Sequence, residues 1–157
     1  MLILMLVCIG SGHSHSAEPP SPQPQPQFYA PVEMVTVDQW LYIANQDSGS
    51  VSVVKTGENR MFSETFIGQR ISSLARVGSQ ARLLFTDEVK HELVLSSLAQ
   101  GHVSVIKRIK VPYSPVGVKS TSDGTLAVVA SLWARQVPLV DIDETEDSGL
   151  ERSQNGN

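Results

Sequence analysis

An apolar segment that ends in a polar residue occurs three times in this chain, at intervals of 42 and 44 residues. The segments read YIAN, LFTD and VVAS, and they end at Asn45, Asp87 and Ser131. Each is followed by a polar or turn-like loop and then by a second apolar segment, at residues 51–54, 93–95 and 137–140. Pairs of apolar segments separated by turn residues are typical of β-hairpins, and a fixed period of this length indicates a repeat architecture.

Two further kinds of strand fill each repeat. Residues 71–77 align with 115–121 at the same spacing of 44, ahead of the second and third hairpins. Residues 102–111 alternate between apolar and polar and predict a fourth strand, for which 61–67 is a weaker counterpart. No window shows the period of about 3.6 residues expected of a helix, so we predict an all-β chain.

Four antiparallel strands in 42–44 residues correspond to one blade of a β-propeller. We therefore predict a partial propeller over residues 28–142, with an incomplete first blade, a complete second blade and three strands of a third. Because closed propellers have about four to eight blades, two to three blades are too few. We expect either a fragment of a longer product or, as the alternative, several copies that assemble into one ring.

The hairpin sequences resemble a known repeat family. YIAN, followed by GSVSVV, resembles the Tyr-Val-Thr-Asn tetrapeptide and the Gly-x-Val-x-Val-Ile of the YVTN propeller repeat, and SPVGVKSTSDGTLAVVAS resembles another part of that repeat. The chain departs from the pattern at Lys55, where an Asp is expected, and at Arg135, where a Gly is expected. The resemblance implies a propeller of the kind found in exported bacterial proteins, surface-layer proteins, lactonase-like enzymes and proteins with c-type cytochrome domains.

The N-terminal region predicts export. The apolar run MLILMLVCI is followed by small residues, as in the apolar part of an export signal, although no Lys or Arg precedes it. We assign residues 1–17 to the signal, with cleavage after Ser16 or Ala17, and the proline-rich residues 18–27 to a linker. The only cysteine, Cys8, then leaves with the signal, so the mature chain has no thiol. We expect a periplasmic, cell-surface or secreted protein with no membrane span in the mature chain.

Charge and composition restrict the choice of partners. The net charge is −4, and the only basic cluster, at residues 107–110, alternates with apolar residues as the solvated face of a strand does. Nucleic acid is therefore not an expected partner. The polar residues 143–157 lack a strand pattern, and we interpret them as a disordered tail.

The resemblance also implies where a ligand binds. In related propellers, the loops between the second and third strands of a blade, and those between blades, surround the mouth of the central channel. In this chain, those loops and the adjoining strand ends hold Gln46 and Glu88 together with nine candidate ligand-binding residues: Asn45, Asp47, Arg70, Asp87, His91, Tyr113, Ser131, Trp133 and Arg135.

Each candidate has a structural alternative. Asp and Asn at strand ends commonly accept hydrogen bonds from turn amides. His91 with Asp87 and Glu88 could bind a metal or could form a charged hairpin tip, and Trp133 could stack on a ligand or pack against the next blade. The sequence contains no Gly-x-Ser-x-Gly elbow and no phosphate-binding glycine loop. We assign no catalytic, metal or cofactor-binding residue.

Two functions stay open at this point. The first is a non-enzymatic exported propeller that binds a protein or small-molecule ligand, within a protein that also carries a c-type haem domain or without one. The second is a lactonase-like hydrolase that acts in the propeller channel. We favour the first because no cluster of His and carboxylate residues recurs in the chain. A haem or a divalent metal is expected only in a longer parent protein, and we expect missing blades or self-association to complete the ring.

Overall fold

The computed structural model describes residues 29–58 and 60–143, which form β-strands without a helix. The predicted signal and linker, and all of the predicted tail except Asp143, lie outside these residues. The strands in chain order are β1 Pro31–Val37, β2 Trp40–Asn45, β3 Ser50–Lys55, β4 Met61–Phe66, β5 Ile71–Arg76, β6 Arg82–Asp87, β7 Glu92–Ala99, β8 His102–Lys110, β9 Pro115–Ser120, β10 Leu126–Ser131 and β11 Leu139–Asp141.

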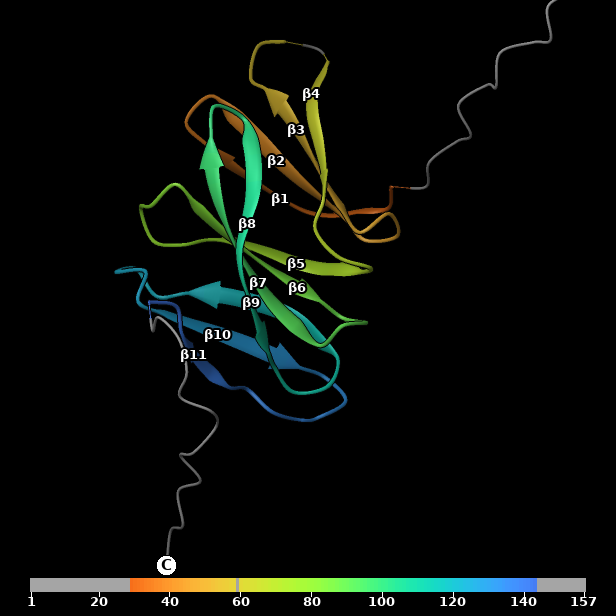
Figure 1. Ribbon diagram of the computed structural model, residues 1–157, viewed down its shortest axis with the longest axis vertical. Coiled ribbons are helices and arrows are strands. Elements are labelled where there is room, and N and C mark those ends of the chain that lie inside the picture. Colours follow the sequence, from red (N-terminus) through yellow and green to blue (C-terminus); the bar gives the residue numbers. More distant parts are fainter. Residues whose placement is uncertain (1–28, 59, 144–157) are drawn as a thin grey trace, which may run out of the picture.

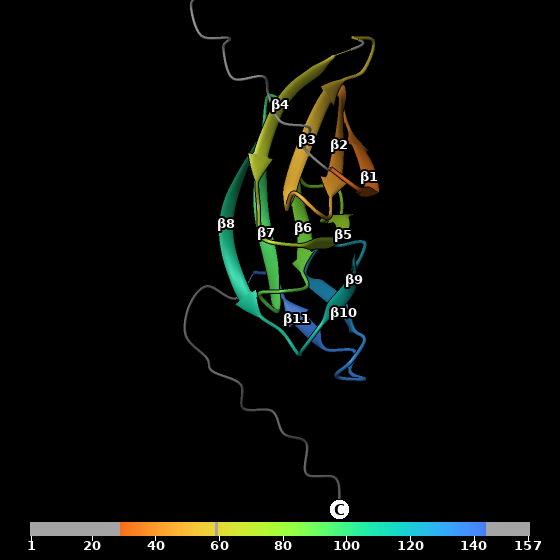
Figure 2. The same cartoon turned by 90° about the vertical axis from the view of Figure 1, so that its right-hand side faces the viewer.

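The strands form three antiparallel sheets in which neighbours along the chain are also neighbours in space. Blade 1 contains β1–β4, blade 2 contains β5–β8 and blade 3 contains β9–β11. Figure 1 shows the blades stacked in chain order, and Figure 2 shows the first strands β1, β5 and β9 along one side and the last strands β4 and β8 along the other. This is the arrangement of propeller blades around an axis, and it confirms the predicted fold class.

Blade 1 is complete, contrary to the prediction. Its first strand, β1, pairs with β2 from Pro31 opposite Asn45 to Val37 opposite Trp40, with one irregularity between Pro31 and Glu33. The strand signal is weak here because β1 comes soon after the proline-rich stretch and carries Glu33 among its apolar residues. The last hairpin also differs from the prediction, since β11 begins at Leu139 rather than 137. Pro138 cannot donate a ladder hydrogen bond, and the loop before it is longer.

The register explains the apolar pattern of each blade. Side chains alternate between the two faces of a strand, so Leu83 and Phe85 face blade 1 whereas Leu84 faces blade 3. Blade 2 is covered on both faces, and its strand β6 is therefore apolar at three consecutive positions. In blade 1, by contrast, Tyr42 and Ala44 are buried against blade 2.

Two apolar cores hold the blades together. The core between blades 1 and 2 contains Val37, Tyr42, Ala44, Val51, Val53, Ile67, Ile71, Leu74, Leu83, Phe85, Val94 and Val103. The core between blades 2 and 3 contains Ala75, Val77, Leu84, Leu93, Leu95, Val111, Val118, Ala127, Val129 and Ile142. Each core draws on both of its blades, so the folded unit depends on the contact between blades as well as on the sheets themselves.

Hydrogen bonds between the innermost strands repeat from blade to blade. Glu33 of β1 accepts the Leu74 backbone N–H of β5 at 2.8 Å and the Ser73 hydroxyl at 2.7 Å. Ser73 is the register equivalent of Glu33, and its hydroxyl in turn accepts the Val118 N–H of β9 at 3.3 Å. Lys119 lies 3.3 Å from the other Glu33 oxygen. The side chain at this position therefore ties its blade to the next one.

The Glu33 carboxylate makes stability depend on pH. Partial burial opposes its charge, but the Leu74 N–H, the Ser73 hydroxyl and Lys119 together outweigh the burial and lower its pKa. A carboxylate whose pKa is lower in the folded state stabilises that state above its unfolded pKa, and this contribution is lost as the pH falls. In urea unfolding, we expect Glu33→Gln to have a lower free energy of unfolding than the wild type at neutral pH. The difference between the two should shrink as the pH falls below about 4.5. A difference that stays constant down to acidic pH would contradict this.

Candidate ligand-binding site

Four loops at one end of blades 2 and 3 surround a pocket of about 370 Å³. They are the connectors between blades, at residues 67–70 and 111–114, and the hairpin loops at 88–91 and 132–138. The pocket is lined by Arg70, Glu88, Val89, His91, Tyr113, Ser114 and Trp133. These are the two kinds of loop that were expected to surround the mouth of a propeller channel.

A neutralised charge pair forms one wall of the pocket. Arg70 Nε lies 3.2 Å from one Glu88 carboxylate oxygen, and the Ser114 hydroxyl donates a hydrogen bond to the other at 3.1 Å. The Glu88 backbone N–H also donates to the Arg70 carbonyl, at 2.9 Å. Because both Glu88 oxygens already have partners and the pair has no net charge, this wall favours neither cations nor anions strongly. The Arg70 guanidinium keeps N–H groups with which it can bind a ligand.

Aromatic side chains form the other wall. The rings of His91 and Tyr113 lie edge to face with their centroids 4.8 Å apart. The Ser114 backbone N–H donates to His91 Nδ1 at 3.4 Å, which leaves the His91 proton on Nε2 when the ring is neutral. Tyr113 is 58% exposed and Trp133 is 70% exposed, so both present ring surface to solvent. Exposed aromatic rings beside hydrogen-bonding groups are a common setting for ligand binding.

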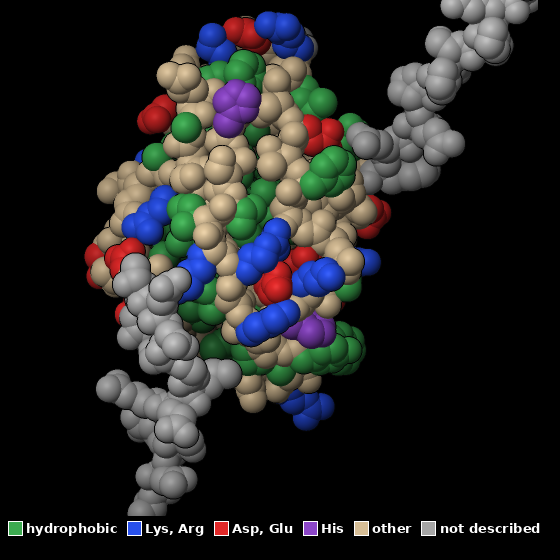
Figure 3. All heavy atoms as spheres, viewed as in Figure 1, with side chains coloured by type: hydrophobic (Ala, Val, Ile, Leu, Met, Phe, Trp, Pro, Cys, Tyr) green, Lys and Arg blue, Asp and Glu red, His purple; other side chains and the backbone are tan. Residues whose placement is uncertain are grey.

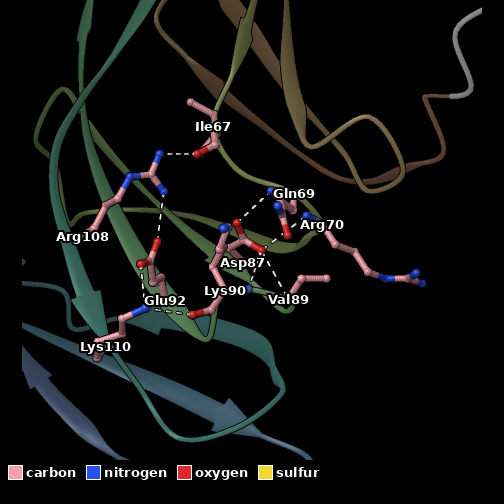
Figure 4. A network of polar contacts seen from close by, with 9 residues as sticks. All are labelled: Ile67, Gln69, Arg70, Asp87, Val89, Lys90, Glu92, Arg108 and Lys110. Carbon is pink, nitrogen blue, oxygen red and sulfur yellow. Dashed lines mark hydrogen bonds and ion pairs between the residues drawn. The ribbon is translucent and has the colours of Figure 1, made fainter.

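Asp87 organises the loops beneath the pocket. It is fully buried at the end of β6, and its carboxylate accepts backbone N–H groups of Gln69 at 2.8 Å, Lys90 at 3.1 Å and Val89 at 3.2 Å, with a longer bond of 3.4 Å from Arg70 (Figure 4). One carboxylate thus fixes the connector that carries Arg70 and the hairpin loop that carries Glu88 and His91. A Cβ on Gly68 would overlap the same carboxylate, which explains the glycine.

The two residues aligned with Asp87 have different partners. The Asn45 side-chain amide donates to the hydroxyls of Ser52 at 2.8 Å and Ser50 at 3.3 Å, within blade 1. The Ser131 hydroxyl donates to the Pro112 carbonyl in the connector before blade 3, at 3.0 Å. All three aligned residues are buried under the loops, where they bind neighbouring chain segments.

The structure brings four of the nine candidate residues together. Arg70, His91, Tyr113 and Trp133 line one pocket. Asp47 lies exposed in the blade 1 hairpin loop, and Arg135 lies in the 132–138 loop without lining the pocket. The prediction placed Glu88 at the mouth without a binding role, and it missed Val89 and Ser114. Both follow directly after residues that the prediction had placed in these loops, so their position in the chain was the available signal.

The basic cluster of β8 also has specific partners. Arg108 donates to the Ile67 carbonyl at 2.6 Å and lies 3.2 Å from Glu92, while Lys110 lies 3.0 Å from the other Glu92 oxygen (Figure 4). The Lys110 hydrogen bond, with the help of Arg108, lowers the pKa of Glu92 despite partial burial. Figure 3 shows basic and acidic side chains gathered over this part of blade 2. Arg108 therefore joins the outermost strand of blade 2 to the connector that leads to the pocket.

Within residues 29–58 and 60–143, no group of three or more His, Cys, Asp and Glu side chains is placed to bind a metal ion. The combination of His91, Asp87 and Glu88 considered from the sequence does not form such a group, because the Asp87 carboxylate is bonded to backbone amides. The same part of the chain contains no helix long and apolar enough to span a membrane.

Solved structures with a similar fold include two enzymes and a β-propeller domain. No protein-family model and no curated protein matches the sequence. Hydrazine synthase of Kuenenia stuttgartiensis is similar over 85% of this chain and 36% of its own, with 20% identity and a TM-score of 0.66. The periplasmic gluconolactonase of Pseudomonas aeruginosa is similar over 76% of this chain and 37% of its own, with 17% identity and a TM-score of 0.67.

The third similar structure is a beta-propeller domain from Myceliophteria thermophila, with 12% identity and a TM-score of 0.52 over 66% of this chain and 37% of that one. At these identities the likeness concerns the fold. The described residues therefore form consecutive blades of a β-propeller. This chain spans little more than a third of the length of each of these proteins.

Proposed function

We propose that this chain is a propeller of the YVTN type that is exported and acts as a binding module, with the pocket between blades 2 and 3 as its ligand site. The observation that carries the proposal is the convergence of Arg70, His91, Tyr113 and Trp133 on one pocket. These four residues come from four different loops, and the resemblance to the repeat family had already placed them at the mouth of the channel. The apolar N-terminal run and the periplasmic origin of one similar protein support export.

The site suits a small molecule or a peptide side chain with a flat apolar face and hydroxyl or carbonyl groups at its edge. The rings of Trp133 and Tyr113 can stack on such a face. The Arg70 guanidinium and His91 Nε2–H can donate hydrogen bonds to the edge. If a c-type haem domain accompanies this propeller, it belongs to a longer parent protein.

Binding can be followed with the intrinsic fluorescence of the chain, which has two tryptophans. In the Trp40→Phe variant, Trp133 is the only tryptophan, and we expect its emission to change in a saturable manner with one member of a panel of saccharides, aldonolactones and aromatic carboxylates. In calorimetry, the Trp133→Ala variant should bind that ligand at least tenfold more weakly, which corresponds to a loss of about 1.4 kcal/mol in binding free energy. No saturable binding to any panel member by calorimetry would count against the proposal.

The same substitution should leave the fold intact. Because Trp133 is 70% exposed, we expect Trp133→Ala to change the free energy of unfolding by no more than about 0.5 kcal/mol. A matched loss of binding and stability would show that Trp133 holds the loop and does not contact the ligand. Arg135→Ala, which alters the same loop outside the pocket, is the control and should bind normally.

A lactonase-like hydrolase is the second candidate, and the similarity to a gluconolactonase favours it. In such a reaction, His91 is the pocket residue of the type most often used as a general base. It could take this role only as the tautomer with its proton on Nδ1, which gives up the hydrogen bond from the Ser114 N–H and leaves Nε2 free to accept a proton. Hydrolysis of D-glucono-1,5-lactone above the spontaneous rate, lost in His91→Ala but kept in His102→Ala, would establish this function. Unchanged rates in both variants would exclude a role for His91.

A further inference from the structure

Some positions that are buried between two blades inside the described unit recur as exposed residues on its two outer faces. Leu74 and Val118 occupy equivalent places in the first strands of blades 2 and 3, opposite Phe85 and Val129, and each is only 2% exposed. The equivalent residue of blade 1 is Met34, which is opposite Ile43 and 61% exposed. Leu74 and Val118 are buried because a preceding blade covers them. The exposed Met34 therefore marks the face on which another blade would pack.

The outer face of blade 3 shows the complementary pattern. Val53 pairs with Tyr42 in blade 1, Leu95 pairs with Leu84 in blade 2, and Leu139 pairs with Val128 in blade 3. Val53 is fully buried and Leu95 is 3% exposed, each beneath the blade that follows. Leu139 is 67% exposed. Leu139 thus occupies the position that the following blade covers in blades 1 and 2, but in blade 3 it is exposed.

These faces are the two halves of one kind of interface. In the core between blades 1 and 2, Val53 and Leu74 belong to the same cluster, and Leu95 and Val118 do so between blades 2 and 3. We propose that Leu139 of one copy packs near Met34 of a second copy, so that two copies join head to tail in a closed ring. Three blades from each copy supply six blades, within the range of about four to eight found in closed propellers.

The uncharged polar groups on the blade 1 face already have hydrogen-bond partners within the blade. Asn45 donates to Ser50 and Ser52, and Ser50 donates to a Glu64 oxygen at 2.7 Å, so these groups already have partners when the face is covered. Buried polar groups with hydrogen-bond partners cost little, whereas exposed apolar faces favour association. A second copy is the occupant that the chain itself specifies, because Met34 and Leu139 occupy the positions through which the blades of this same chain already pack against each other.

The mass in solution gives the first test. In analytical ultracentrifugation, the whole chain is expected to have twice its monomer mass of 17.0 kDa at high micromolar concentration. Met34→Glu and Leu139→Lys each place a charge in the interface and should shift the protein to monomers. Ile106→Glu is the matched control, since Ile106 is 53% exposed on β8, away from both faces, and it should leave the mass unchanged. A wild-type chain that stays monomeric at every concentration overturns the proposal and indicates that other blades cover these faces.

Cross-linking tests the head-to-tail order without charged substitutions. Because Cys8 is the only cysteine, a Cys8→Ser background allows single cysteines to be placed by Met34→Cys in one copy and Leu139→Cys in another. A short bis-maleimide should link the two variants when they are mixed and should link neither variant alone. Cross-links within the Met34→Cys variant alone would show a symmetric face-to-face contact and would overturn the head-to-tail ring. Neither result depends on ligand binding in the pocket, so the test is separate from that of the proposed function.

Discussion

Replacement of Phe85 by alanine is expected to lower the free energy of unfolding by about 3–5 kcal/mol. Phe85 is fully buried at the centre of β6, in the core that joins blade 2 to blade 1. Its removal takes a large apolar surface out of that core and leaves a cavity that two sheets cannot easily close, because both are fixed by their own ladders. Unfolding in urea, followed by tryptophan fluorescence, measures the loss.

Phe66→Ala provides the control for this prediction. Phe66 is 64% exposed at the end of β4, the outermost strand of blade 1, so the same chemical change should cost no more than about 0.5 kcal/mol. A small effect for Phe85→Ala, similar to that of the control, would mean that blades 1 and 2 do not depend on their shared core. The difference between the two variants therefore measures how strongly the blades are coupled.

The repeat made most of the fold predictable from the sequence. Strands with a counterpart one period away, such as 71–77 and 115–121, were placed within a residue of their observed ends. The first strand, β1, was missed because its apolar residues include the exposed Met34 and it carries Glu33, whose role depends on Ser73 forty residues later. A side chain that binds another blade gives no local pattern in the sequence.

The candidate site was predictable only in part, for a similar reason. The position in the repeat identified loops that meet, and it therefore found Arg70, His91, Tyr113 and Trp133. It could not separate residues that line the pocket from those that lie beneath it. Asp87 and His91 belong to the same hairpin, but one is buried among backbone amides and the other borders the pocket. That distinction depends on the direction of each side chain.

Replacement of Asp87, which lies beneath the pocket, is expected to have a second large effect on stability. Asp87→Ala is expected to lower the free energy of unfolding by about 2–4 kcal/mol, because it leaves several partly buried backbone N–H groups without their acceptor. It should also abolish ligand binding, since the connector of Arg70 and the loop of His91 would lose their common anchor. Urea unfolding and calorimetry measure the two losses.

Two further variants test whether these losses come from the hydrogen bonds of Asp87 or from the removal of a negative charge. Asp47→Ala removes an exposed carboxylate from the blade 1 loop and should change stability by no more than about 0.5 kcal/mol. Asp87→Asn keeps one acceptor oxygen, so it should retain part of the stability and part of the binding. If Asp87→Ala weakened binding but not stability, Asp87 would contact the ligand directly. If the carboxylate acts through the loops that it holds in place, Asp87→Asn should lose stability and ligand binding to a similar extent.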